Sequence, residues 1–413
     1  MPLTQEQIEL LGERLVPLFQ EFEFYVIGDI VRRLKKTGRF TETAELMAQG
    51  MRRQGFSPAV IRSQVLRYVK ADKAYIEAIN ENTLGAKQEL AEKIKELRAK
   101  AGPIADAAVN DAADFAFNED LAAWKGDRLP VKGSAFEKLV SAMRQRTGGE
   151  IVNLTKTMGF KSSTGENILL EGIYTHLANQ ALIKTATGAF SYQQALEDAV
   201  RELAKSGIRM IDFESGYTRQ ADTAVRNALI TASSQLAGQI TMMNAEDTGV
   251  ELVEVSKHWG ARTGVGHGNH AAWQGGIYCI RGTDGKHRNL EEATGYPSDP
   301  KGLCGYNCRH VFYPFWEGVS TPTQWPKEPE PVEIDGKTYT YYQATQQQRY
   351  MERQIRALKR EAYAMREAGK SAKAQYAKQR AKELEIEYNE FSEAAGISPK
   401  PNRLRVVTIS TNQ

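Results

Sequence analysis

The sequence is poor in cysteine, carries little net charge and has no long apolar run. Three cysteines among 413 residues are too few for the disulfide framework of a small secreted protein and suit a reducing cytoplasm. No stretch approaches the roughly 20 apolar residues that span a bilayer, and the first residues lack the basic start and apolar run of a secretion signal. The formal net charge is only +3, so any electrostatic function must be local. We therefore expect a soluble protein made in the cytoplasm.

The hydrophobic pattern of the first 245 residues predicts helices. Overall, 41% of the residues are hydrophobic and 25% are charged, which is ordinary for a globular chain with more than one domain. Leu11, Leu15, Leu18 and Phe22 recur at intervals of three or four, which places them on one side of a helix. Three places are expected to interrupt the helical patterns: Gly38, Gly55 and Gly102-Pro103.

Short β-segments are expected mainly after residue 246. The first convincing strand is the valine-rich segment 250–255, and the others are 277–280, 310–315 and a hairpin over 332–340. Asp335-Gly336 is a turn pair typical of a two-residue hairpin loop. The sequence therefore predicts a mainly α fold with a small α+β domain.

These patterns divide the chain into six segments. Residues 125–134 read KGDRLPVKGS, whose glycine, proline and charge content is typical of an exposed linker. We expect a N-terminal helical region (1–125), a linker (126–134), a helical domain (135–245), a small α+β domain (246–341), a long basic helix broken at Gly369 (342–396) and a C-terminal tail (397–413) in which residues 403–409 alternate like a strand.

Most residues with useful chemistry fall in one glycine-rich stretch, residues 258–316. Glycine at this density is typical of tight turns beside polar groups rather than of helices. The stretch holds all three cysteines and several histidines: Cys279, Cys304, Cys308, His258, His267, His270 and His310.

Two cysteines and a histidine in this stretch suggest a metal site. Cys304, Cys308 and His310 supply two sulfurs and one imidazole within seven residues, and zinc in proteins takes four such ligands in a tetrahedron. His258, His267 or His270 could supply the fourth ligand, and His258 is the first choice. The alternative is a buried hydrogen-bond network that contains no metal, because a cytoplasmic cysteine is often a small apolar core residue.

An enzyme is the second interpretation of the same residues. Cys308 with a histidine and Asp284 or Asp299 would form a nucleophile, base and orienting group, and a zinc ion with an open position would hydrolyse a phosphodiester or peptide. The sequence has no nucleophile elbow, phosphate-binding loop or His-Glu-x-x-His pair that supports either reaction. No catalytic residue is therefore assigned.

The C-terminal helical pattern concentrates positive charge. Eleven basic residues and only three acidic ones lie between positions 349 and 382, a local charge of +8. Such a surface binds DNA phosphates by releasing counterions, or binds an acidic protein surface; the alternative is a solvated helix face. The residues assigned to this contact are Arg349, Arg353, Arg356, Lys359, Arg360, Arg366, Lys370 and Lys373.

Three boxes in the central stretch resemble the phage minor capsid protein 2 family, which is related to the head-morphogenesis proteins associated with the portal of tailed phages. They are the run from His258 to Arg262, the segment 267–274, and the sequence Asn-Cys-Arg-His at 307–310. Their motif residues are Arg262, His267, His270, Trp273 and Arg309.

The resemblance implies a structural minor head protein present in multiple copies in the virion and assembled in the host cytoplasm. It would lie near the portal vertex or inside the capsid and act in head assembly or in DNA packaging or ejection. The implied partners are the portal protein, the major capsid protein and packaged double-stranded DNA, with no membrane. A virion hydrolase that uses the histidine and cysteine cluster is the alternative.

Overall fold

Helices make up 65% of the residues that the structure describes, and the strands among them are few and short. The computed structural model describes residues 5–212 and 214–406. The predicted fold class, mainly α with a small α+β region, is confirmed. Among the described residues, no helix is both long and apolar enough to cross a lipid bilayer.

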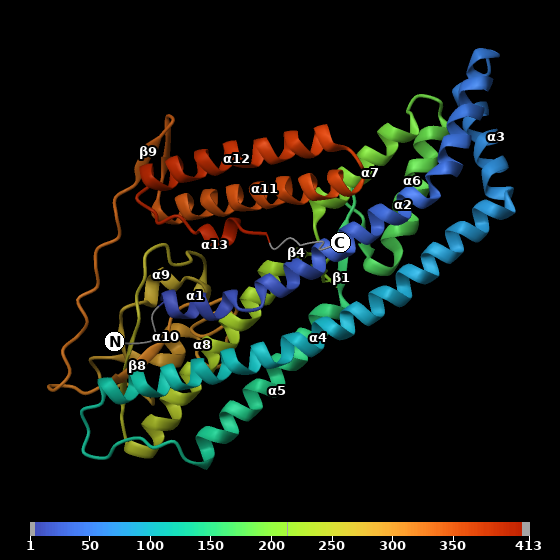
Figure 1. The fold of residues 1–413 in the computed structure, drawn as a ribbon. Coiled ribbons are helices and arrows are strands. Elements are labelled where there is room, and N and C mark those ends of the chain that lie inside the picture. The colour runs from blue at the N-terminus through green and yellow to red at the C-terminus, as the bar shows by residue number, and fades with distance from the viewer. Residues whose placement is uncertain (1–4, 213, 407–413) are drawn as a thin grey trace.

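Two very long helices, drawn in blue and in blue to cyan, run diagonally across the molecule (Figure 1). The N-terminal helices are α1 (Gln5–Glu13), α2 (Val16–Arg53), α3 (Pro58–Ala71) and α4 (Lys73–Ala123). The prediction that Gly38 interrupts α2 was wrong. A side chain at Gly38 would collide with the Tyr192 hydroxyl, so this glycine lets another helix pack closely against α2. Gly55, by contrast, does follow the end of α2 and has a φ of +81°.

The prediction that Gly102-Pro103 ends a helix was also wrong, because α4 continues through Pro103. A proline ring normally clashes with the side chain of the preceding residue when that residue is helical, and Gly102 has no side chain. Buried alanines on both sides, including Ala101 and Ala105, pack into the main hydrophobic core. This packing outweighs the hydrogen bond that proline cannot donate.

A four-stranded antiparallel sheet that was not expected lies in the middle of the chain. It has the order β2-β1-β3-β4, from β1 (Met158–Lys161), β2 (Asn167–Leu169), β3 (Arg209–Ile211) and β4 (Thr218–Gln220). Each strand has three or four residues, which is too short for the alternation of side chains to be visible in the sequence. In chain order, the helices around this sheet are α5 (Ser134–Lys156), α6 (Leu170–Ala186), α7 (Tyr192–Ser206) and α8 (Ala221–Thr248).

The small α+β region follows α8 and contains the predicted strands. β5 (Leu252–Val255) pairs with β6 (Ile277–Cys279) on one side and with β8 (Phe312–Phe315) on the other, and β7 (Arg288–Asn289) completes the sheet order β7-β6-β5-β8. Its short helices are η1 (Gly266–Gly268), α9 (His270–Trp273) and α10 (Leu290–Thr294). The core of this region includes Val253, Trp273, Cys308 and Phe312.

The C-terminal part forms a helical hairpin rather than one long helix. The predicted β-hairpin is present as β9 (Val332–Ile334) and β10 (Lys337–Tyr339). α11 (Tyr341–Glu367) then turns at Gly369, which has a φ of +79°, and α12 (Ser371–Ala394) runs back beside it (Figure 1). The strand expected at 403–409 was wrong for its first residues, because Pro401–Leu404 is a short helix, α13; residues 407–409 lie outside the described residues.

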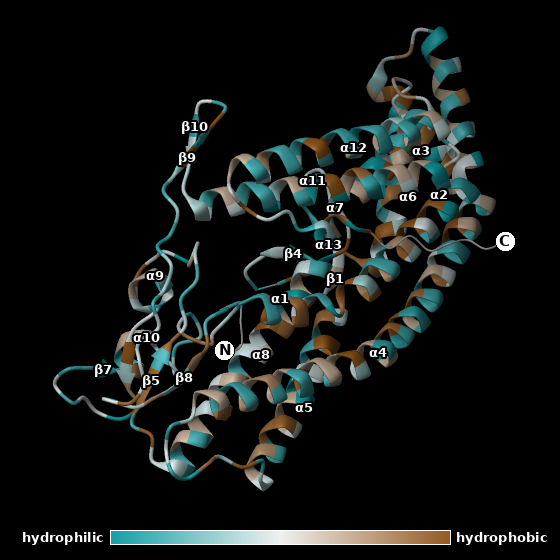
Figure 2. Cartoon of the chain, turned by 60° about the vertical axis from the view of Figure 1, so that its left-hand side comes forward, coloured by the Kyte–Doolittle hydropathy of each residue, from teal (hydrophilic) through white to brown (hydrophobic). Residues whose placement is uncertain are grey.

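Each long helix buries a hydrophobic face, and these faces hold the N-terminal helices and the C-terminal hairpin together. In Figure 2 these helices carry hydrophobic and hydrophilic bands along their length, as expected for helices that bury one face. The largest core joins residues of α2, α4, α6, α7 and α8 with Tyr363, Ala364 and Met365 of α11. The C-terminal hairpin is therefore packed onto the N-terminal helices.

Candidate functional site

The cysteine and histidine cluster lies on loops that connect the strands of the small α+β region. β5 leads to His258, α9 begins at His270, and the loop 302–311 leads into β8. That loop is tightly wound, with φ values of +56° at Cys304 and +52° at Asn307. Side chains at Gly302 and Gly305 would collide with the carbonyl oxygens of Thr294 and Pro300, so the two glycines permit the close path of the backbone.

Three potential metal ligands converge at this point. Cys308 Sγ lies 3.6 Å from His310 Nδ1 and 3.9 Å from His270 Nδ1, and the three atoms lie within 4.8 Å of one another. The side chains are buried, with exposed fractions of 1% for Cys308, 1% for His310 and 3% for His270. We call Cys308, His270 and His310 together the Cys–His–His cluster.

The outer nitrogen of each imidazole in the cluster donates a hydrogen bond. His270 Nε2 lies 2.9 Å from the Lys301 carbonyl oxygen, which can only accept. His310 Nε2 lies 3.0 Å from Gln274 Oε1, and the same oxygen accepts from the backbone N–H of His258. Both Nε2 atoms therefore carry hydrogen, and the lone pairs of both Nδ1 atoms face Cys308 when the rings are neutral.

Burial keeps the cluster in its neutral form. Desolvation lowers the pKa of His270 to about 4 and that of His310 well below its ordinary value, and it raises the pKa of the Cys308 thiol to about 11. At neutral pH the free protein has two uncharged imidazoles and one thiol here.

The structure does not bring together the ligand set expected from the sequence. Cys308 and His310 meet His270 instead of Cys304 and His258. Cys304 Sγ lies 3.8 Å from the His310 carbonyl oxygen. His258 stacks on His310, with ring centroids 4.2 Å apart and an interplanar angle of 24°, and its Nδ1 lies 3.0 Å from the Trp259 carbonyl oxygen.

The other motif residues hold the surrounding loops together. His267 Nδ1 pairs with Asp299 at 2.9 Å, and Trp273 Nε1 donates to the His267 carbonyl oxygen. Arg262 donates to the Tyr306 carbonyl oxygen, and Arg309 Nε lies 3.1 Å from Glu9 of α1. Arg309 therefore ties the small region to the N-terminal helix.

The groups proposed to activate Cys308 as a nucleophile lie elsewhere. Asp284 pairs with His287 at 2.7 Å, while Asp299 pairs with His267. In the described part of the chain, neither carboxylate contacts Cys308. The orienting acid of a cysteine nucleophile is therefore not assembled here.

The eight basic residues assigned to a partner contact fall into three groups. Arg356 and Arg360 are buried, at 4% and 2% exposed, and they pair with Asp222 and Glu23. Half-buried Lys359 and Lys370 pair with Glu385 and Glu197, and half-buried Arg349 lines a cavity of about 120 Å³ beside His258. The exposed members are Arg353, Arg366 and Lys373.

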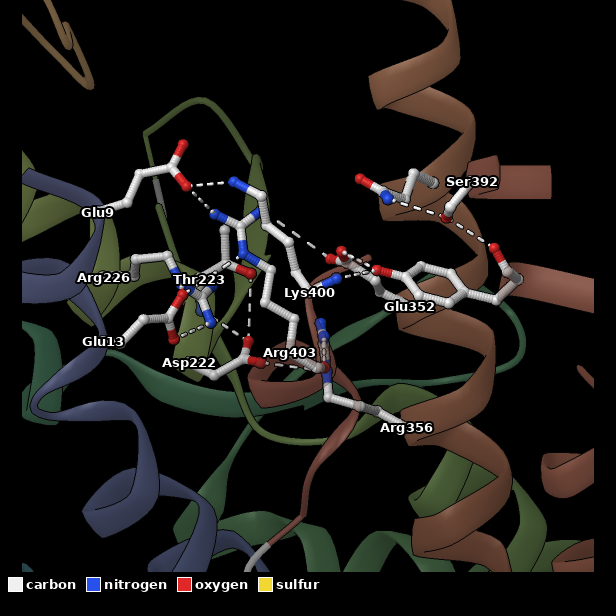
Figure 3. Close-up of polar contacts among 12 residues, drawn as sticks. Glu9, Glu13, Asp222, Thr223, Arg226, Glu352, Arg356, Ser392, Lys400 and Arg403 are labelled. Carbon is white, nitrogen blue, oxygen red and sulfur yellow. Dashed lines mark hydrogen bonds and ion pairs between the residues drawn. The ribbon is translucent and has the colours of Figure 1, made fainter. Parts of the chain in front are cut away.

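Sequence reasoning missed the acidic side chains that pair with buried arginines such as Arg356. Glu9 and Glu13 of α1, Asp222 and Arg226 of α8, Glu352 and Arg356 of α11, and Arg403 of α13 form an ion network that links four helices (Figure 3). Sequence spacing carried no signal for it, because its members come from four separate helices.

The exposed cations of the C-terminal hairpin border a groove. Its volume is about 570 Å³, and Arg366, Lys378 and Lys382 line it together with the partly exposed pair of Lys359 and Glu385. Three of these side chains are therefore open to a negatively charged partner.

Comparison with known proteins places the chain among phage proteins. The family model described as phage minor capsid protein 2 matches residues 3–392. A structural protein of Lactococcus phage LL-H is 24% identical over 248 residues, which cover 59% of this chain and 63% of that relative. The match thus spans less than two thirds of the relative's length. No solved structure matches this chain.

Proposed function

The chain belongs to the phage minor capsid protein 2 family, and on that premise we propose that it is a portal-associated head protein that acts in assembly or in DNA packaging or ejection. The resemblance predicted from the three boxes in the central stretch is confirmed. The chain is a structural protein of a phage virion. The position in the head, the partners and the step in which it acts are our proposal.

The observation that carries the proposal is the basic groove of the C-terminal hairpin. Arg366, Lys378 and Lys382 converge on it from α11 and α12, and no ion pair within the described residues neutralises them. Cations placed along a groove bind a phosphate backbone without regard to base sequence. We assign this face to packaged double-stranded DNA and the long N-terminal helices to the portal or the inner capsid wall.

A rigid connection between the hairpin and the rest of the chain supports a structural role. The ion network joins α1, α8, α11 and α13 in the interior. Arg360 of α11 also pairs with Glu23 of the long helix α2, so a load on the hairpin would be passed to a helix that we assign to the portal. Several copies around the portal would place their grooves along the path of the DNA.

The virion hydrolase is the less favoured function, because the Cys–His–His cluster is almost fully buried. We propose a non-catalytic role. Nuclease and protease assays of the purified chain, with and without chelator, test this point, and chelator-sensitive turnover by the wild type that the Cys308→Ala variant lacks would contradict it.

The experiment that tests the proposed position is localisation of the chain in an intact particle. Asymmetric reconstruction of mature phage should show its density at the portal vertex, and a tagged chain should be recovered with portal protein from assembly intermediates. Density spread evenly over the shell, or absence of the chain from both mature particles and assembly intermediates, would refute the proposal.

A further inference from the structure

The Cys–His–His cluster has two hydrogen-bond acceptors, the Nδ1 atoms of His270 and His310, but only one hydrogen to share between them, that of the Cys308 thiol. His270 and His310 both direct an Nδ1 lone pair at Cys308 Sγ, because their Nε2–H groups are used by Lys301 and Gln274. A thiol has a single hydrogen and donates it to one nitrogen at a time. In a metal-free protein one lone pair therefore faces sulfur without a donor, which is costly for side chains as buried as these.

We propose that Cys308, His270 and His310 bind one zinc ion through Sγ and the two Nδ1 atoms. A metal ion accepts all three lone pairs at once and removes the conflict. Zinc–sulfur and zinc–nitrogen bonds of about 2.3 and 2.0 Å at tetrahedral angles separate sulfur from nitrogen by about 3.5 Å. The separations of 3.6 and 3.9 Å in this cluster lie within a few tenths of an ångström of that value.

The surroundings of the two histidines support this assignment independently. Metal-binding histidines usually donate their second N–H to a carbonyl or carboxylate, which fixes the tautomer and aims the other nitrogen at the ion. His270 donates to a backbone carbonyl, and His310 donates to a glutamine oxygen that the His258 N–H holds in place. Mixed sulfur and imidazole donors favour zinc over magnesium or calcium, which prefer oxygen.

The fourth ligand is assigned to water rather than to Cys304. His270 lines the cavity of about 120 Å³ that also borders His258, so one member of the cluster has space beside it. Cys304 lies outside the group of donor atoms that are mutually within reach. Binding replaces the Cys308 S–H proton by the metal and releases that proton to solvent, and no electron is transferred.

A zinc ion here would fix the loops of the small α+β region. The three ligands come from α9 and from the segment before β8, which are separated in the chain by more than thirty residues that include β6, β7 and α10. Joining them stabilises the folded state by the free energy of metal binding. This inference does not depend on the position of the chain in the head.

The test uses the full chain and compares two buried cysteines of one loop. Elemental analysis of the wild type after dialysis against trace zinc should give about one zinc per chain. Cys308→Ala and His310→Ala should lose it, while Cys304→Ala should retain it. Circular dichroism establishes that each variant is folded. Equal loss in Cys304→Ala and Cys308→Ala, or a folded wild type that takes up no zinc, would overturn the proposal.

A second measurement needs no variant. X-ray absorption of the zinc-loaded wild type should be fitted by one sulfur, two imidazole nitrogens and one further light atom. The cobalt-substituted protein should show a thiolate-to-cobalt charge-transfer band. Two sulfur ligands, or only oxygen ligands, would contradict the assigned site.

Discussion

Arg356 Nε lies 3.2 Å from the Asp222 carboxylate, and this ion pair joins α11 to the first turn of α8 in the protein interior. The same guanidinium donates to the carbonyl oxygen of Arg403 at 2.8 Å. Both partners are almost inaccessible, with side chains 4% and 9% exposed. The C-terminal hairpin is thus held to the central helices by a buried charge pair.

The first prediction concerns this pair. Removing one partner leaves the other charge buried and unpaired, which typically costs about 3–5 kcal/mol. We expect Arg356→Met to lower the free energy of unfolding by that amount. Exposed Arg353→Met on the same helix is the matched control and should change stability by less than about 0.5 kcal/mol. Denaturant titration of the three proteins measures both effects, and equal stability of the variants would count against the buried pair.

The second prediction is loss of stability in acid. Burial alone would raise the pKa of Asp222, but Arg356, Arg226 and Arg360 outweigh it and lower the pKa to about 2. The ionised carboxylate therefore stabilises the fold above its ordinary pKa near 4, and this contribution is lost as pH falls toward 2. A shift of this size corresponds to about 2 kcal/mol. The free energy of unfolding should fall as pH drops from 5 to 2, and Asp222→Asn should flatten that dependence.

A different carboxyl group gives the third prediction, of opposite sign. Desolvation raises the pKa of Asp120 to about 7, although Asn244 and Thr241 donate hydrogen bonds to it. Its contribution is fully present below the ordinary pKa and is lost as pH rises through 7. Asp120→Asn mimics the neutral form, so it should stabilise the protein by roughly 2–4 kcal/mol at pH 8 and much less at pH 4.

Exposed Asp114 of the same helix provides the control for Asp120. Its carboxylate pairs with Lys132 at the surface, so Asp114→Asn should have a small effect that is similar at both pH values. Thermal unfolding at pH 4 and pH 8 separates the two variants. A stabilisation by Asp120→Asn that is the same at both pH values would argue against a buried ionisable group.

Local signals predicted several elements well. The Asp335-Gly336 turn pair was enough to place the β9–β10 hairpin, and the valine-rich segment 250–255 located β5. Gly38 and Gly102-Pro103 were wrongly predicted to end helices, because whether a helix continues through them depends on packing with residues far away in the sequence. Tyr192 fills the space beside Gly38, and the sequence around residue 38 holds no trace of it.

The site was predicted by residue type but not by geometry. Glycine, histidine and cysteine density located the cluster, yet the pairing of Cys308 with His270 rather than Cys304 depends on how the loop before β8 is wound. The charges of α11 were likewise visible in the sequence. That Arg356 points inward and Arg353 outward follows from acidic residues of other helices, which no local pattern reveals.

The fourth prediction concerns glycines of the cluster loop. A methyl group at position 305 would collide with the Pro300 carbonyl oxygen, so Gly305→Ala should shift the loop and destabilise the protein by about 1–3 kcal/mol. Gly149 lies inside α5 with open space around it, and Gly149→Ala should stabilise by about 1 kcal/mol. Opposite signs in thermal unfolding are expected, and destabilisation of similar size in both variants would contradict the tight loop.

The last prediction tests the groove on the C-terminal hairpin. A triple variant with glutamate at positions 366, 378 and 382 removes three cations that line it. Because each phosphate contact releases counterions, the slope of log affinity against log salt for double-stranded DNA should become shallower by up to about three.

The matched control places glutamate at three exposed basic positions of α3, which are Arg62, Arg67 and Lys70. Both triple variants therefore carry the same net charge. If net charge alone governs binding, the two triple variants will weaken it equally, and the groove has no special part. If the groove holds DNA, only the hairpin variant will lose most of the affinity, while its unfolding free energy stays near that of the wild type because all three side chains are exposed.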